Sequence, residues 1–551
     1  MRVLGTLLVL GCGLTGTLQA QGPSPAPARP EALMAHIRFL ADDLLEGRLT
    51  GTRGFDLAAL YVAAQFEALG LTPAGSTPGS YLQPVPLRVA RVDEASARGE
   101  WSRGERRESL TYASDLVLVP SFHATSVDLE AGVVFVGYGI DAPELGHDDY
   151  AGVDVRGKVV AYLFGAPAGF PNDQRAHWGQ VLSKVRTAAA KGATGMLMVR
   201  TKDAQPPMPW TRLVDQLRQP AMRWLDDQGR PADTPEGIRA SGLLSAEAAE
   251  RLFEAAGRPL GPLAADVKAG RGASFDLGAT LRLHVESRHE QVSSPNVVGL
   301  LPGGDVSGET VVVSAHLDHV GVGVPREGDA IYNGAYDNAS GVAGMLELAR
   351  VLAAGPRPRR NVAFVAVTGE ERGLLGSDYF ARRPTAPGIV GNLNLDMITM
   401  LTPLLDVIAY GAEHSSLGGV VERAARAEGL ELSPDPFPEQ FIFVRSDHYS
   451  FVRQGVPAIY LFPGLKRADS RVDGKAEAMK WVQARYHAPQ DDLSQPFDTQ
   501  AGARFVGVAA RVLREMADGE QPPRWNEGDF FGETYGKQRT AAAAGPAPRR
   551  P

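Results

Sequence analysis

An alternation of apolar strands, loops and amphipathic helices after residue 294 constrains the fold of this chain more than any other feature. Patterns typical of strands occur at 296–301, 309–315, 361–367, 392–396, 405–410 and 456–462. Helical patterns lie between or after them, at 339–354, 374–383, 416–428 and 499–518. Strands that alternate with helices form a mostly parallel sheet covered by helices. The sequence therefore predicts an α/β fold, with its catalytic domain over residues 286–520.

The segment 111–285 has a different pattern and predicts a separate, mainly β module inserted into the chain. It contains short apolar runs such as VVFVGYGI (133–140) and KVVAYLFG (158–165), separated by turn-forming residues. Residues 31–110 precede this insertion and begin with two amphipathic helical patterns. We expect residues 31–110 to form the first part of the α/β domain.

The first twenty residues predict an export signal. Arg2 is followed by an apolar run from Val3 to Leu18 and by a polar break at 19–21. An uncleaved anchor is the alternative, although the run is short and glycine-broken for a membrane span. We therefore expect a periplasmic or extracellular protein. A Pro-rich tether at 21–30 would follow the signal, and a tail at 521–551 would end in disorder.

Cys12 is the only cysteine of the 551 residues and lies within this apolar run. Its context resembles a weak lipoprotein box, so a membrane is an expected partner only if Cys12 is lipidated. Cleavage after Ala20 would leave a mature chain with no disulfide and no thiolate ligand. The formal net charge of -8 gives no reason to expect nucleic acid as a partner.

Several acidic and histidine side chains follow the predicted strands or precede the predicted helices. Ligands of an open α/β sheet bind at the carboxyl ends of its strands, so these groups can converge on one edge. Imidazole and carboxylate suit zinc, and two zinc ions close together need a bridging carboxylate. We predict a site for two zinc ions whose ligands are His316, Asp337, Glu371, Asp396 and His487.

Within this set, Asp337 is the expected bridge. His316 and Asp396 would hold one ion, and Glu371 and His487 would hold the other. This division leaves room on each ion for a shared water molecule.

Four nearby residues complete the predicted site. Asp318, two residues after His316, could orient its imidazole. Glu370 is left as a free carboxylate beside the ligand Glu371, which is what a general base requires. Tyr486 could donate a hydrogen bond to an oxyanion, although a packing role is at least as plausible, and Arg445 could contact the substrate or remain a surface residue.

Each of these motifs alone has an ordinary structural explanation. YDNASG (336–341) could be only a helix cap, and TGEERG (368–373) only a solvated loop. Ser446, Asp447 and His448 look like a serine-hydrolase triad, but adjacent residues cannot align as nucleophile, base and orienting acid. The convergence of the whole set on one edge of the sheet favours the metal site.

At these motifs the sequence resembles the co-catalytic zinc aminopeptidase family, which includes glutamate carboxypeptidase, animal glutaminyl cyclases and the inactive transferrin receptor. The motifs AHLDHVG, GAYDNASGVAGMLELAR, TGEERGLLGS, NLNLDMI, RSDHYSF and YHAPQDDL occur in the family's order between residues 296 and 518. DDLLEGRLTGTRG (42–54) resembles the family's usual start. The insertion, at 138–165, resembles a protease-associated domain.

The resemblance implies the same five zinc ligands, with Glu370 as general base and Asp318 as a supporting aspartate. Arg445 and Tyr486 match positions that contact substrate or intermediate in some members only. The implied function is an exported aminopeptidase acting on peptides or proteins. A carboxypeptidase, a glutaminyl cyclase and a non-catalytic receptor-like protein are the alternatives, and the intact ligand set counts against the last.

Overall fold

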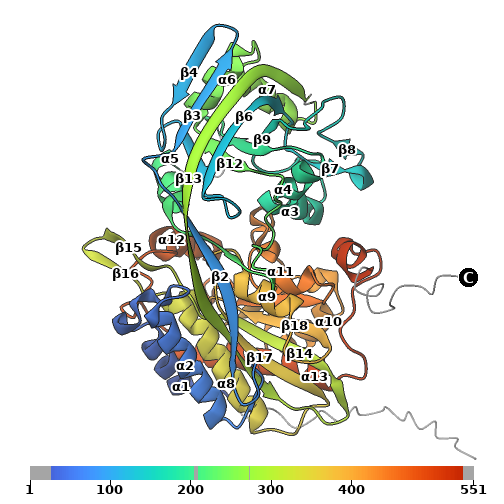
Figure 1. Ribbon diagram of the computed structural model, residues 1–551. Coiled ribbons are helices and arrows are strands. Elements are labelled where there is room, and N and C mark those ends of the chain that lie inside the picture. The colour runs from blue at the N-terminus through green and yellow to red at the C-terminus, as the bar shows by residue number, and fades with distance from the viewer. Residues whose placement is uncertain (1–26, 204–208, 272–273, 538–551) are drawn as a thin grey trace, which may run out of the picture.

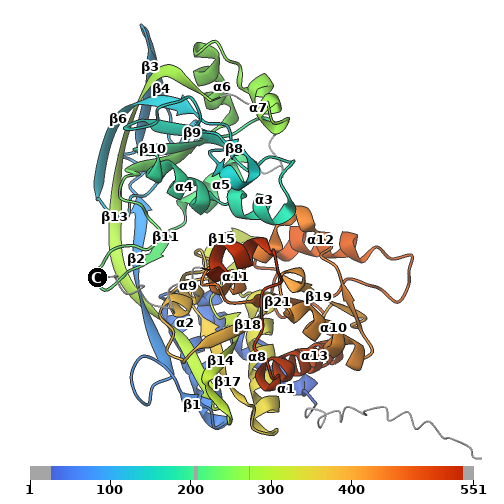
Figure 2. The same cartoon turned by 90° about the vertical axis from the view of Figure 1, so that its right-hand side faces the viewer.

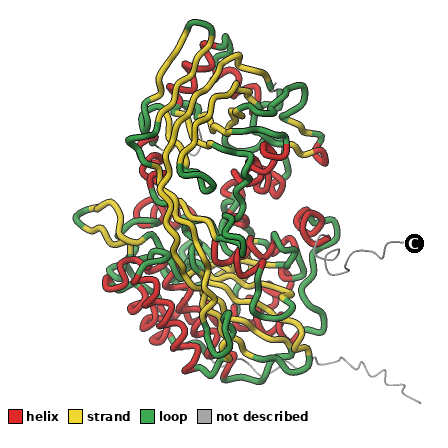
Figure 3. The backbone as a smooth tube through the Cα atoms, in the orientation of Figure 1, coloured by secondary structure: helices red, strands yellow, loops and turns green. Residues whose placement is uncertain are grey.

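The computed structural model describes residues 27–203, 209–271 and 274–537. The predicted export signal, Cys12, most of the Pro-rich tether and the end of the tail lie outside the described residues. The described chain forms two lobes (Figures 1 and 2), and strands run through both of them (Figure 3). Among the described residues, no helix is both long and apolar enough to cross a membrane.

The larger lobe is built on a sheet whose central strands are parallel. From edge to edge the order is β11–β2–β13–β17–β14–β18–β21–β19–β20. The parallel centre consists of β17, β14, β18 and β21, and the short β1 pairs with the end of β13. The strands are β1 (Thr72–Pro73), β2 (Leu82–Val92), β11 (Ala221–Trp224), β13 (Phe275–Leu301), β14 (Val306–His316), β17 (Arg360–Val367), β18 (Ile389–Leu395), β19 (Asp406–Tyr410), β20 (Glu431–Ser433) and β21 (Ala458–Pro463).

Helices cover both faces of this sheet because its central strands are apolar on both faces. Val311 and Val313 of β14 belong to one buried cluster with α1, α2, α8, α10 and α13. Val312, between them, belongs to another cluster with α9 and α11. The helices are α1 (Pro30–Leu40), α2 (Arg53–Ala68), α8 (Gly341–Ala353), α9 (Leu375–Arg382), α10 (Leu417–Ala427), α11 (His448–Val452), α12 (Gly474–Arg485) and α13 (Thr499–Asp518). The predicted α/β fold is confirmed.

The smaller lobe has its own sheet, in the order β4–β3–β13–β6–β9–β10–β12–β5. Its strands besides β13 are β3 (Arg98–Arg103), β4 (Arg106–Leu110), β5 (Leu116–Val119), β6 (Ser126–Phe135), β9 (Val159–Leu163), β10 (Gly195–Val199) and β12 (Ala240–Leu244). Its helices are α3 (Asn172–Gly179), α4 (Val181–Ala190), α5 (Trp210–Arg218), α6 (Ala246–Ala255) and α7 (Leu260–Lys268).

The expected limits of the insertion, 111 and 285, differ from those of the smaller lobe. Strands β3 and β4 pair within this lobe, so its sheet begins at Arg98. At the other end β13 runs without a break through residue 285, because one long strand serves both sheets. Strand β11, although inside the predicted insertion, pairs with β2 in the larger sheet.

Short elements complete the fold. The hairpin of β15 (Gly321–Arg326) and β16 (Asp329–Tyr332) projects from the larger lobe, and β7 (Asp141–Ala142) pairs with β8 (His147–Asp148) in the smaller one. The single-turn helices are η1 (Asp43–Arg48), η2 (Pro143–Leu145), η3 (Ala335–Ser340), η4 (Ala412–His414), η5 (Pro438–Gln440), η6 (Ile442–Val444) and η7 (Gly532–Gly536).

Candidate metal centre

The parallel strands bring three predicted ligands to one edge of the sheet. His316 is the last residue of β14, and Asp396 directly follows β18. Glu371 comes after the turn that follows β17. Because β14 lies between β17 and β18, their carboxyl ends are adjacent. Asp337, in η3, and His487, just after α12, approach the same edge from loops.

The inner half of the centre consists of His316 and Asp396. The His316 Nε2 atom lies 3.2 Å from Asp396 Oδ1 and 3.2 Å from Asp337 Oδ1. The Nδ1 atom of His316 lies 3.1 Å from the carbonyl oxygen of Asp318. When Nδ1 carries the imidazole proton and donates a hydrogen bond to this carbonyl, the lone pair of Nε2 is free to bind a cation.

The outer half consists of His487 and Glu371. The His487 Nε2 atom lies 3.0 Å from Glu371 Oε2 and 3.2 Å from Asp337 Oδ2. Asp337 therefore presents Oδ1 to the inner half and Oδ2 to the outer half. This is the placement that a carboxylate bridging two cations requires.

His319, which the sequence reasoning did not select, also faces the outer half. Its Nδ1 atom lies 2.8 Å from Glu371 Oε1 and 3.8 Å from Asp337 Oδ2. The side chain is fully buried. The motif AHLDH did carry a signal, because its second histidine follows the first by three residues in the same loop.

The unpaired atoms of these side chains show that the site fits metal ions. Despite the short distances, Nδ1 of His319, Oε1 of Glu371, Oδ2 of Asp337 and Nε2 of His487 make no hydrogen bond in the described structure. Buried polar atoms rarely remain unpaired. Two groups have ligand atoms within 4.8 Å of one another: His316 with Asp337 and Asp396, and His319 with Asp337 and Glu371. Nitrogen and oxygen donors of this kind suit zinc.

Asp318 supports the centre differently from what the sequence predicted. Its carboxylate accepts hydrogen bonds from the backbone N–H groups of Glu370, at 3.1 Å, and Glu371, at 3.3 Å. Its backbone carbonyl, rather than its side chain, faces His316. The Asp318 side chain therefore positions the turn that carries the expected general base and an outer ligand.

Asp491 supports the bridging residue in a similar way. Its two carboxylate oxygens accept hydrogen bonds from the backbone N–H groups of Tyr336 and Asp337, both at 3.0 Å. The sequence reasoning did not select Asp491, although it lies four residues after His487 in the motif YHAPQDDL.

A buried hydrogen-bond chain ends on Asp396, a predicted ligand of the inner half. Asn392 donates to Ser314, Ser314 donates to Asn394, and Asn394 donates to Ser446. The Ser446 hydroxyl then donates to Asp396 Oδ2 at 2.7 Å. This contact gives Ser446 a positioning role and agrees with the rejection of a serine-hydrolase triad. Tyr460 adds a hydrogen bond from its hydroxyl to the carbonyl oxygen of Asp396, at 3.0 Å.

Arg48 joins the two loops that carry His316 and Asp337. Its buried guanidinium donates to the carbonyl oxygens of Leu317 at 2.9 Å, Asn333 at 2.7 Å and Gly334 at 3.1 Å. Burial lowers the pKa of Arg48 to about 10, which still keeps it charged at neutral pH. Its positive charge offsets part of the negative charge of the neighbouring carboxylates.

The neighbouring carboxylates Glu370 and Glu371 have opposite electrostatic environments. Burial raises the pKa of Glu370 well above its usual range, and Glu371 and Asp447 add to this effect while His316 opposes it. Burial also acts to raise the pKa of Glu371, but the imidazole of His487 outweighs it and the pKa falls to about 2. Glu370 is thus the carboxylate with the higher proton affinity, as a proton-transferring group requires.

Tyr486 lies beside the outer half, and its ring stacks on the His487 ring with centroids 3.9 Å apart. Burial raises the pKa of Tyr486 well above its usual range, with further contributions from Asp337, Glu371 and Glu370. The phenol therefore remains a neutral O–H donor. Arg445 is exposed to solvent, and its charge opposes the rise in the pKa of Tyr486.

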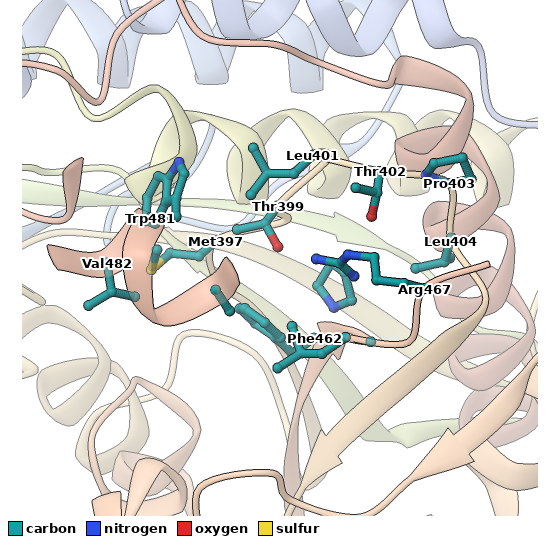
Figure 4. A pocket seen from close by; sticks show the side chains of 14 residues that line it. Met397, Thr399, Leu401, Thr402, Pro403, Leu404, Phe462, Arg467, Trp481 and Val482 are labelled. Carbon is teal, nitrogen blue, oxygen red and sulfur yellow. The ribbon is translucent and has the colours of Figure 1, made fainter. Parts of the chain in front are cut away.

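A pocket lies beside the loop that follows Asp396. One wall begins at Met397, which directly follows Asp396 and whose N–H donates to Asn338 at 3.0 Å. Trp481 and Val482 of α12, which leads to Tyr486 and His487, lie beside Met397 in this pocket (Figure 4). The lining residues are mostly apolar: Met397, Thr399, Leu401, Thr402, Pro403, Leu404, Phe462, Pro463, Gly464, Leu465, Arg467, Ala478, Trp481 and Val482.

Comparison with known families and sequences agrees with this geometry. Residues 296–513 match the model of Peptidase family M28. Leupeptin-inactivating enzyme 1 of Streptomyces exfoliatus is 28% identical over 247 residues, covering 41% of this chain and 50% of the relative. A probable zinc metalloprotease of Pyrenophora tritici-repentis is 38% identical over 299 residues, covering 46% of this chain and 59% of the relative. The chain thus spans 50% to 59% of the length of these curated relatives.

Among solved structures, the aminopeptidase from Aneurinibacillus sp. strain AM-1 is similar to nearly the whole chain. The similarity covers 89% of this chain and 95% of that one, with a TM-score of 0.52 and 20% sequence identity. This likeness shows that the two chains share a fold.

Proposed function

We propose, from the premise that residues 296–513 belong to peptidase family M28, that this chain is an exported di-zinc aminopeptidase. The single observation that supports two ions most strongly is the bridge, because the two oxygens of Asp337 face different imidazoles, His316 and His487. His316 and Asp396 would hold one ion, and Glu371 and His487 the other. The ions would supply Lewis-acid polarisation of the scissile carbonyl and a lowered pKa of bound water.

Glu370 acts as the general base. It is not one of the proposed ligands, yet Asp318 fixes its backbone beside Glu371. Its raised proton affinity lets its carboxylate take a proton from the attacking water and later deliver that proton to the leaving amine. Tyr486, held as a neutral phenol, donates a hydrogen bond to the oxyanion that develops on the carbonyl oxygen.

The substrate is a peptide or protein with a free N-terminus. The centre is rich in carboxylates, and Glu370 and Asp396 would meet the substrate's ammonium group. The pocket that begins at Met397 accepts the side chain of the N-terminal residue, since it adjoins Asp396 and has a mostly apolar lining. Arg445, exposed at the rim, contacts the remainder of the peptide.

Kinetics on the purified full-length chain would test this proposal. We expect turnover of aminoacyl reporter substrates, no turnover of C-terminal reporter substrates and about two zinc ions per chain. Glu370→Gln, which keeps the shape of the side chain but cannot accept the proton, should lower kcat by roughly 10²- to 10⁴-fold. Glu422→Gln, on the exposed face of α10, is the matched control and should leave kcat unchanged.

Three outcomes would contradict the proposal. Cleavage of C-terminal reporters alone would favour the carboxypeptidase alternative. Cyclisation of N-terminal glutamine without hydrolysis would favour the cyclase. Active protein without zinc, or Glu370→Gln with normal turnover, would exclude the mechanism. Fractionation of the native host cells, followed by immunodetection, would test export.

A further inference from the structure

One partly buried carboxylate joins the two lobes at a point away from β2 and β13. Asp233 lies in the loop between β11 and β12, and its side chain is only 17% exposed. Three arginines donate to it: Arg186 at 2.6 Å, Arg382 at 3.0 Å and Arg453 at 3.3 Å. The Arg453 side chain is only 11% exposed, so its pair with Asp233 is shielded from solvent and holds geometry more strictly than an exposed pair.

The three arginines come from both lobes. Arg186 belongs to α4 of the smaller lobe, Arg382 is the last residue of α9, and Arg453 directly follows α11. A second carboxylate, Asp378 of α9, accepts from Arg382 at 3.0 Å and from Arg453 at 2.7 Å. Asp233 is therefore the acidic group through which the smaller lobe reaches α9 and α11.

Helix α9 is continuous with the turn that carries Glu370 and Glu371. The N–H of Leu374 donates to the carbonyl of Glu370 at 3.0 Å, and the N–H of Gly376 donates to that of Thr368 at 2.7 Å. A shift of α9 along its axis would therefore move the general base and an outer ligand.

Helix α11 is continuous in the same way with Ser446, which donates to the inner ligand Asp396. The N–H of Tyr449 donates to the carbonyl of Ser446 at 3.0 Å. The hydroxyls of Ser377 in α9 and Ser450 in α11 lie 2.9 Å apart, so the two helices are also joined directly.

Electrostatics makes the position of Asp233 critical. Burial acts to raise its pKa, but Arg382, Arg186 and Arg453 outweigh burial and lower the pKa to about 2, so the group is charged at neutral pH. Without this charge, Arg382 and Arg453 would share Asp378 as their remaining carboxylate partner, and the Arg186 pair with Asp233 would be lost. Like charges at such short range repel, and α9 and α11 would be pushed apart.

We propose that Asp233 is a positioning residue. Through it the smaller lobe holds α9 and α11 in place, and these two helices hold both halves of the candidate metal centre in position. This inference rests on the proposed function for its kinetic consequence. It gives the inserted lobe a structural role in the catalytic geometry that does not depend on contact with the substrate.

The test is Asp233→Asn in the full-length chain. Asp233 has a positive φ of 54°, a conformation that asparagine adopts readily, so this variant removes the charge and keeps the backbone. We expect kcat to fall and zinc release to a chromogenic chelator to accelerate, each by roughly tenfold, with KM within about twofold of the parent value. Asp233→Glu, which restores the charge, should recover part of kcat.

Asp227→Asn is the matched control. Asp227 also joins the lobes, through Arg383 at 2.7 Å, but its side chain is 78% exposed. An exposed pair contributes little, so kcat and zinc release should match those of the parent chain. Hydrogen exchange followed by mass spectrometry should show faster exchange at 374–382 and 446–453 in Asp233→Asn, and unchanged exchange in α1.

Parent-like kcat, zinc release and exchange in Asp233→Asn would overturn the inference. If Asp233→Asn does not fold, the same measurements are made on Arg186→Gln. Unchanged kcat and unchanged hydrogen exchange in Arg186→Gln would also overturn the inference. A parent chain without any peptidase activity would defeat the proposed function alone, because the exchange measurement would still decide the role of Asp233.

Discussion

The inner and outer halves of the metal centre contain similar side chains but are held in different ways. His316 and Asp396 are 1% and 11% exposed and stand at the ends of neighbouring parallel strands. Ser446 and Tyr460 both bind Asp396, and the Asp318 carbonyl binds His316. The inner half is therefore preorganised by the sheet and by buried hydrogen bonds.

The outer half depends on loops. His487 is 32% exposed, has a positive φ of 50° and follows the end of α12. Its Nε2, the Nδ1 of His319 and the Oε1 of Glu371 make no hydrogen bond in the described structure. The inner half is thus ordered by hydrogen bonds within the protein, whereas in the proposed site a bound ion would satisfy the unpaired polar atoms of the outer half. We therefore expect the inner half to bind zinc more tightly.

The largest expected effect comes from removing the residue that both halves share. Asp337→Ala should reduce bound zinc to below one ion per chain and lower kcat/KM by at least about 10³-fold, since several kcal/mol of transition-state stabilisation are lost. Zinc would be counted by elemental analysis after dialysis. Asp492→Asn, whose carboxylate binds only its own turn at Ser494, is the control and should behave as the parent chain. Two retained zinc ions in Asp337→Ala would refute the bridge.

The second prediction separates the halves directly. His487→Ala should keep close to one zinc ion per chain, because the inner half remains intact. His316→Ala should lose the more tightly held ion and should retain less zinc at the same free concentration. Isothermal titration of the metal-free variants measures both. Equal zinc affinities in the two variants, or a higher zinc affinity in His316→Ala, would contradict the expectation that the inner half binds zinc more tightly.

A smaller effect is expected from the support of the inner half. Ser446→Ala removes the hydrogen bond to Asp396 Oδ2 and should weaken inner-site zinc affinity by roughly tenfold. Tyr460→Phe removes a hydrogen bond to the backbone carbonyl of Asp396, not to its carboxylate, so zinc affinity should fall less than in Ser446→Ala. Competition with a chromogenic chelator, in the His487→Ala background, isolates the inner site. An unchanged affinity in Ser446→Ala would show that the sheet alone orders Asp396.

The smallest effect concerns pH in the metal-free chain. Burial acts to lower the pKa of His487, but Glu371 and Asp337 outweigh it and raise the pKa to about 10. A folded-state pKa above the unfolded value of about 6.5 stabilises the fold below that pH, and this stability is lost as pH rises toward 10. The Tm of chelator-treated protein should therefore fall by about 1–2 °C over this range through His487. His487→Gln should remove this component, and an identical pH profile in the variant would contradict the assignment.

One sequence pattern predicted both the parallel centre of the sheet and the convergence of the predicted ligands on one edge of it. Strand runs such as 309–315 and 361–367 have apolar centres, Val311–Val313 and Val362–Val367, which is typical of strands covered on both faces, and His316 and the TGEE turn follow where the runs end. His316 and Asp396 could be placed because they are adjacent in sequence to such ends. Their backbone positions follow from the strand itself.

The other contacts of the site join segments that lie apart in the sequence. No local sequence pattern predicts how closely such segments approach each other. His319 was missed because it follows His316 by three residues in a loop, where no periodicity indicates the direction of a side chain. The side-chain contacts of Asp318 could not be predicted for the same reason. Strand β13 alternates exposed and buried residues across both sheets, so no change of sequence pattern marks a boundary at residue 285.

Strands β2 and β13 pair at the point where the chain enters and leaves the smaller lobe. Val92 pairs with Ser287, and the N–H of Asp93 donates to the carbonyl of Glu286 at 2.9 Å, so the two ends of the smaller lobe meet at a single point. A short turn there could replace residues 94–285 and leave β2 and β13 as an ordinary hairpin at the margin of the catalytic sheet. Removal of residues 94–285 would therefore leave intact the strands whose ends carry His316 and Asp396, although the contacts of Asp233 would be lost.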